Sequence, residues 1–109
     1  MRTLRFIVDN QIIKQDPGCD FSNIVPGSEG YLRAEFSFSS EWEGSVRVAT
    51  FLSSKNKEYP PQPLKDGTWC VIPAEALVKR SFKVGVIGKK NGFKLTTNKV
   101  LVEQNGGGV

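Results

Sequence analysis

Glu41 and Glu43 are the residues whose types and spacing most invite a chemical interpretation. They flank Trp42 in the stretch SSEWEGSVRVATF, whereas the other acidic residues are scattered along the chain. Two carboxylates can cleave a glycosidic bond, one as the acid and the other as the nucleophile or base. Here one residue separates them on an expected turn, and the sequence suggests no cleft. A solvated turn is therefore the preferred interpretation.

The residue types that most catalytic and metal sites require are missing. The 109 residues include no His, which removes the commonest general base and the imidazole metal ligand. Cys19 and Cys70 are too few for a four-ligand zinc site, and VIGKKNG lacks the spacing of a phosphate-binding loop. We expect no enzymatic activity, no metal and no cofactor.

Short strands are the elements that this chain must use to position any site. In YLRAEFSFS, apolar Leu32, Ala34, Phe36 and Phe38 alternate with polar residues, as in a strand with one buried face. SFKVGVIG alternates in the same way, and Asn91-Gly92 after it is a strong hairpin signal. The inward set of SVRVATFL is not assigned by its pattern.

The remaining segments complete an all-β pattern. MRTLRFIVDNQIIK is expected to be a first strand with a turn at Asp9-Asn10, rather than a signal peptide. Pro73 and the alanines after it favour one short helical turn near 73–78. About seven or eight strands, with turn signals every 8–12 residues, predict an antiparallel β-sandwich of immunoglobulin-like type. Residues 1–103 are expected to form one domain, and residues 104–109 a flexible Gly-rich tail.

Trp42 permits two interpretations. It can be an exposed aromatic residue that binds a ligand, or a structural plug that covers the open end of the core. We prefer the plug, because Gly44 allows a sharp turn after it and burial of an indole is strongly stabilising. Glu41 and Glu43 would then face water.

Four other residues are candidate contacts with a partner. Trp69 has the opposite parity to Cys70 and Ile72, so it is expected outside the core, beside the Pro-rich loop that contains Tyr59. Seven basic residues and no acidic ones lie between Leu77 and Val102, and Lys89 and Lys90 mark the expected hairpin tip. This run is either a patch for an anionic partner or a set of solvated lysines that protect strand edges.

Three quoted stretches carry a resemblance to a known group of proteins. They are YLRAEFSFSSEWEGSVRVATF, DGTWCVIPAEAL and FKVGVIGKKNGFKLTTNKVLVE, within residues 30–103. Their order resembles small β-sandwich proteins and domains encoded by tailed bacteriophages of Firmicutes. The Trp turn combined with CVIP and LTTN is the most specific part. The resemblance implies a virion component: a head-fibre base, a capsid decoration protein, or a baseplate or tail accessory domain.

The expected function is therefore that of a non-enzymatic virion structural protein, made in the host bacterial cytoplasm. It would dock on a capsid or tail lattice through Trp69, Tyr59 and the lysines at the hairpin tip, and it can form homo-oligomers there. One alternative is a carbohydrate-binding module, which would need Tyr31, Tyr59 and Trp69 along one face. Another is a β-barrel that binds single-stranded nucleic acid. We expect neither a nucleic-acid nor a membrane partner, since basic and aromatic residues do not interleave and no apolar run reaches about 18 residues.

Overall fold

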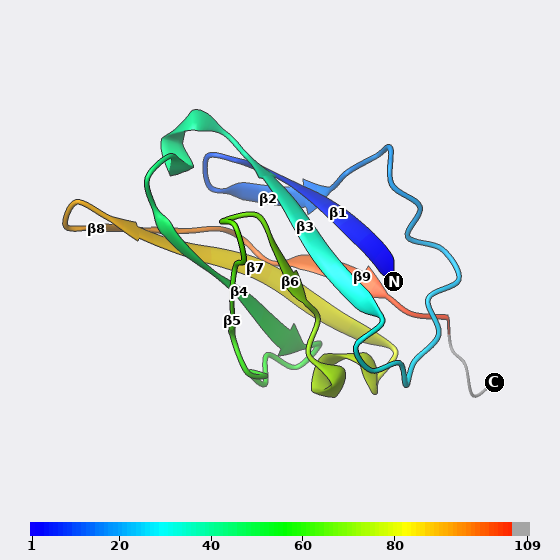
Figure 1. The fold of residues 1–109 in the computed structure, drawn as a ribbon. Coiled ribbons are helices and arrows are strands. Elements are labelled where there is room, and N and C mark those ends of the chain that lie inside the picture. The colour runs from blue at the N-terminus through cyan, green and yellow to red at the C-terminus, as the bar shows by residue number, and fades with distance from the viewer. Residues whose placement is uncertain (106–109) are drawn as a thin grey trace.

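A computed structural model describes residues 1–105 of the chain, and within them nine strands form two sheets that pack face to face (Figure 1). The first sheet, sheet A, has the strand order β2-β1-β3-β6. Its strands are β1 (Arg2–Asp9), β2 (Ile12–Gln15), β3 (Leu32–Phe38) and β6 (Trp69–Val71). The all-β, sandwich-like architecture expected from the sequence is confirmed.

The second sheet, sheet B, has the order β5-β4-β7-β8, and β9 also pairs with β7. Its strands are β4 (Val46–Ser53), β5 (Gln62–Pro63), β7 (Ser81–Lys90), β8 (Phe93–Thr96) and β9 (Val100–Glu103). The strand β7 is the longest, and the hairpin that it forms with β8 projects beyond the rest of the molecule (Figure 1). The Pro-rich segment contributes only the two-residue edge strand β5, as expected for residues without an N–H donor.

One pairing corrects the expected antiparallel arrangement. The strands β1 and β3 run parallel from Arg2↔Leu32 to Val8↔Phe38. Parallel neighbours need a long connection, and the hairpin to β2 followed by the loop over residues 16–31 supplies it. Alternation in the sequence identifies a strand's buried face but not its direction, so the pattern did not reveal this pairing. The loop itself contains no strand.

Side chains from both sheets meet in one core. Leu4, Phe6 and Phe36 of sheet A are buried against Phe51 and Phe82 of sheet B. On β7 the residues that alternate inward are the apolar ones, as the sequence predicts. On β4, whose inward set the pattern left open, Ala49 and Phe51 point into the core.

Two helical turns accompany the strands. The expected turn near 73–78 is a 3-10 helix, η2 (Ala74–Leu77), and a second, η1 (Ser40–Trp42), contains the Trp turn. The first hairpin loop is Asn10-Gln11, one residue later than expected, because Asp9 pairs with Ile12. The hairpin turn at Asn91-Gly92 forms as expected, and both residues have positive φ angles.

The folded part extends past the expected boundary at residue 103. Gln104 is buried, and its backbone N–H donates to the Arg80 carbonyl. Asn105 donates from its backbone to Ile24 and from its side chain to Asn23. These two residues therefore belong to the domain, and the rest of the expected tail, residues 106–109, lies outside the described residues.

Candidate functional site

Trp42 lies at one end of the gap between the two sheets. Its side chain is 0% exposed, and its ring centroid is 5.2 Å from that of Phe38 on β3. The indole N–H donates to the carbonyl of Asn10, at 2.7 Å, which satisfies the polar atom of the buried ring. The indole is therefore part of the core and not available to a ligand, while Glu41 and Glu43 on either side are exposed.

Gly88 on β7 provides the space that this ring occupies. A Cβ atom at position 88 would lie 2.7 Å from Cζ3 of Trp42 and 3.0 Å from its Cε3. Real Cβ atoms do not approach other atoms so closely. The ring thus spans from Phe38 of sheet A to the backbone of sheet B.

Arg47 holds the Trp turn in place. Its guanidinium donates to the carbonyls of Trp42 and Gly67, each at 2.7 Å, and to the Ser45 hydroxyl. The same group stacks 4.2 Å from the Phe38 ring. Partial burial lowers the pKa of Arg47 from its ordinary value. All three of its nitrogens donate to groups within the fold, so Arg47 has a structural role at this turn.

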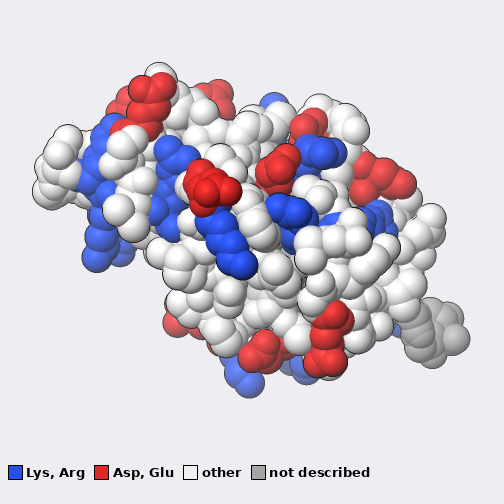
Figure 2. All heavy atoms as spheres, in the orientation of Figure 1, with Lys and Arg blue, Asp and Glu red and all other residues white. Residues whose placement is uncertain are grey.

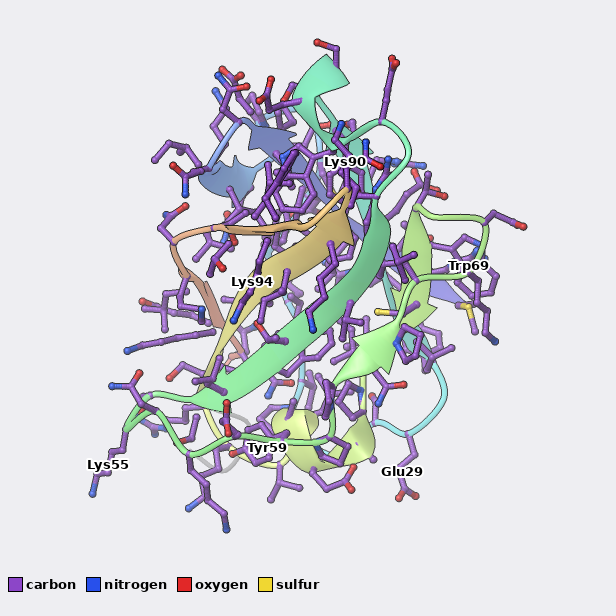
Figure 3. The ribbon with its side chains drawn as sticks, turned by 90° about the vertical axis from the view of Figure 1, so that its left-hand side faces the viewer. Glu29, Lys55, Tyr59, Trp69, Lys90 and Lys94 are labelled. Atoms are coloured by element: carbon purple, nitrogen blue, oxygen red, sulfur yellow. The ribbon has the colours of Figure 1, made fainter. Side chains whose placement is uncertain are left out.

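Trp69 lies on the outer face of sheet A, as its parity predicts, with Cys70 and Ile72 buried. It is half-buried, since the Arg33 guanidinium stacks 3.7 Å from its ring and Lys65 Nζ lies 4.9 Å from the ring centroid. Figure 3 shows Trp69 on one side of β4, and Lys94 on the other. The structure therefore does not bring Trp69 together with the lysines of the hairpin.

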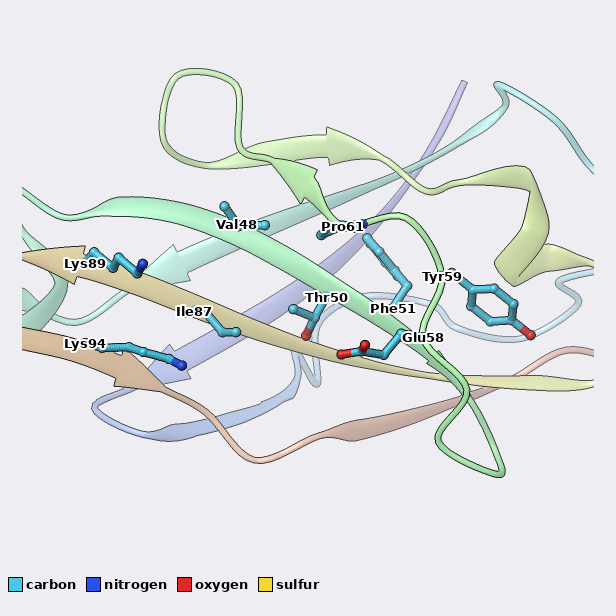
Figure 4. Close-up of a pocket in the computed structure, with 9 residues that line it drawn as sticks. All are labelled: Val48, Thr50, Phe51, Glu58, Tyr59, Pro61, Ile87, Lys89 and Lys94. Atoms are coloured by element: carbon cyan, nitrogen blue, oxygen red, sulfur yellow. The ribbon is translucent and has the colours of Figure 1, made fainter.

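Tyr59 and Lys89 line the same groove on the outer face of sheet B, toward its opposite ends (Figure 4). We call it the β4–β7 groove; it has a volume of about 370 Å³. Its lining residues are Val48, Thr50, Phe51, Glu58, Tyr59, Pro61, Ile87, Lys89 and Lys94. Lys90, in contrast, points to the other face of the hairpin, where its Nζ donates to the carbonyl of Glu43 at 2.7 Å.

The floor and the wall of the groove are fixed by the fold. Val48 and Ile87 are cross-strand partners on β4 and β7 and form the apolar floor. The wall is the loop that carries Tyr59 and Pro61. It is held along β4 by the hydrogen bond from Tyr59 N to Phe51 O, 2.9 Å, and by the bond from Leu64 N to Arg47 O. The prolines in this loop restrict φ, so the groove is largely pre-formed.

Charge is unevenly distributed along the groove. Lys89 and Lys94 lie at one end, and Glu58 lies at the other (Figure 4). Lys89 and Lys94 are directly opposite each other across β7 and β8. Among residues 1–105 the one ion pair is Arg5–Glu35, on the other sheet, so neither lysine has a carboxylate partner there. Basic side chains gather at this end of the molecule in Figure 2.

The sequence alone does not indicate that one surface contains Val48, Ile87, Lys94, Glu58 and Pro61. In the sequence, Lys94 stands out only as one of the seven basic residues between Leu77 and Val102. The register of β4 against β7 brings Val48 to Ile87, and only the Asn-Gly hairpin signal pointed to the pairing of Lys89 with Lys94.

The LTTN stretch, residues 95–98, has a structural role between β8 and β9. The buried Thr97 hydroxyl accepts from Val86 N, and Asn98 Oδ1 accepts from Ile13 N at 2.7 Å. Asn98 N also donates to the carbonyl of Gln11. These contacts join sheet B to the β1–β2 hairpin of sheet A.

Three further features concern the Cys70 thiol, metal-binding side chains and long apolar helices. Burial raises the pKa of the Cys70 thiol to about 12, so this thiol stays protonated at neutral pH. Among residues 1–105, no three His, Cys, Asp or Glu side chains are grouped so that they could hold a metal ion. No helix in that range is long and apolar enough to cross a membrane.

Comparisons with known proteins do not assign the chain to a family. It matches no family model, no curated protein and no solved structure. The resemblance to phage virion proteins therefore stays a prediction from the sequence.

Proposed function

We propose that this chain is a non-enzymatic structural protein of a tailed-bacteriophage virion that docks on an acidic surface of the capsid or tail. One observation carries the proposal: the outer face of sheet B presents a pre-formed groove whose lysines have no acidic partner in the folded domain. A protein that binds through such a face needs a partner of opposite charge. The absence of His from the sequence supports a binding role rather than catalysis.

The geometry favours docking over the carbohydrate-binding alternative. A sugar-binding face needs exposed aromatic rings in a row. Of the three candidate rings only Tyr31 is exposed, whereas Trp69 on sheet A and Tyr59 in the loop beside sheet B are both half-buried. The barrel expected for the nucleic-acid alternative is not supported, since the described strands form two separate sheets. We also propose that the sandwich is immunoglobulin-like, as expected from the sequence. The two packed sheets support this relation, whereas the parallel pairing of β1 with β3 argues against it.

The direct test is to look for the protein in purified particles. Virions of the phage that encodes the chain are purified on a density gradient, and peptides of the chain are quantified by mass spectrometry against the major capsid protein. We expect a fixed copy number per particle. Abundant protein in the lysate with none in the purified virions would contradict the proposal.

A further inference from the structure

Lys89 and Lys94 are two like charges directly opposite each other on β7 and β8, and both line the β4–β7 groove. Like charges directly opposite each other on paired strands destabilise a sheet, and here no carboxylate of residues 1–105 lies within ion-pair distance of either one. Both side chains belong to the groove, so both can reach one anion placed there (Figure 4). A bound carboxylate would turn the repulsion into two charge-assisted hydrogen bonds.

The apolar floor of the groove indicates that the ligand carries an apolar group beside its anionic group. Ile87 lies two residues from Lys89 on β7, so both side chains point outward, about 6.7 Å apart along the strand. An extended chain has the same two-residue period. A segment lying along β7 would therefore place an acidic side chain at the lysines and, two residues away, an apolar side chain over Val48 and Ile87. Glu58 at the far end favours a basic residue two positions further on.

The charge of this face argues against the same face of a second copy of the chain as the occupant. Lys83, Lys89 and Lys94 all alternate to the outer face, and the stem of Lys99 lies over Gly85 on the same side. Two such faces brought together would repel each other. The groove offers an apolar floor but no open aromatic ring for a base or a sugar, because Tyr59 is half-buried against the core.

We propose that the β4–β7 groove binds an extended segment of a partner protein, with the pattern acidic residue, any residue, apolar residue, any residue, basic residue. Resting on the proposed function, this inference names the chemistry of the docking partner. The carboxylate binds between Lys89 and Lys94, and the apolar side chain packs on Val48 and Ile87.

The test uses the complete 109-residue chain, labelled with ¹⁵N, and the pentapeptide acetyl-Glu-Thr-Val-Thr-Lys-amide. A matched peptide has Gln in place of Glu. Amide shifts are followed by NMR as each peptide is added. We expect the acidic peptide to shift Val48, Ile87, Lys89 and Lys94, and to bind at least about fivefold more tightly than the Gln peptide.

Two protein variants make the result specific. Lys94→Glu places opposite charges across the hairpin, so the protein should fold at least as well, yet binding of the acidic peptide should weaken at least about tenfold. Lys14→Glu makes the same charge change on the exposed edge strand β2 and should alter binding less than twofold.

Several results would overturn the inference: equal binding of the two peptides, no binding of either, shifts that map elsewhere, or shifts that follow protein concentration and so reveal self-association. Peptide binding by a protein that is missing from virions would overturn the proposed function and leave this inference intact. Incorporation into virions without binding of the Glu-containing peptide would overturn this inference and leave the proposed function intact.

Discussion

Trp42 and Gly88 form the contact on which one end of the sandwich depends. The ring is fully buried between Phe38 and the Gly88 backbone, and its N–H has a backbone acceptor. The alternative that Trp42 binds a ligand would require the ring to leave this site. We therefore expect substitution of Trp42 to lower the free energy of unfolding.

We predict that Gly88→Ala lowers the free energy of unfolding by about 1–3 kcal/mol, because the added methyl group collides with the Trp42 ring. Trp42→Ala should cost about 3–5 kcal/mol by leaving a cavity. Trp42→Leu removes the six-membered ring from Gly88. In that background, Gly88→Ala should lower the free energy of unfolding clearly less than it does in the wild type. Denaturant unfolding of the single and double variants measures this coupling. Strictly additive losses would show that the two residues do not share the contact.

The segment between β8 and β9 links the two sheets through hydrogen bonds. Asn98 acts as a short piece of strand: its side-chain amide meets the backbone of Ile13, and its own N–H meets Gln11. The hydroxyl of Thr97 satisfies Val86 N in the buried part of this link. The hydrogen bonds of Thr97 and Asn98 to the backbone therefore account for these two polar side chains without a ligand.

Asn98→Leu is expected to lower the free energy of unfolding by about 1–2 kcal/mol, since Ile13 N–H loses its acceptor. Asn98→Asp keeps an oxygen at that position and should cost less than half as much. Thermal or denaturant melts compare the two. If both variants lose the same stability, or Asn98→Leu loses none, the side-chain bridge does not contribute as described.

The sequence predicted the elements whose signals are local. Alternation placed Phe36 and Phe82 in the core, parity placed Trp69 outside it, and Asn91-Gly92 marked the hairpin. The parallel β1–β3 pairing was missed, because strand direction depends on a long connection rather than on alternation. The groove was missed for a related reason: its floor and wall come from β4, β7 and the Tyr59 loop, and only their register brings them together.

For the whole molecule, the two outer faces differ in character. On sheet A, the exposed side chains of Arg5 and Glu35 form an ion pair, and the guanidinium of Arg33 stacks on the Trp69 ring. On sheet B, Lys89 and Lys94 have no acidic partner within residues 1–105, and they lie beside an apolar groove. We therefore propose docking through sheet B and predict that a charge change on sheet B alters binding more than the same change on sheet A.

Binding of the purified chain to particles that lack it tests this assignment most directly. Wild-type protein, Lys94→Glu and Lys14→Glu are each mixed with such particles, and the bound fraction is measured by co-sedimentation at two salt concentrations. We predict that Lys94→Glu binds at least about tenfold more weakly, that Lys14→Glu binds like the wild type, and that added salt weakens wild-type binding. Equal binding of all three proteins, or loss confined to Lys14→Glu, would contradict docking through the outer face of sheet B.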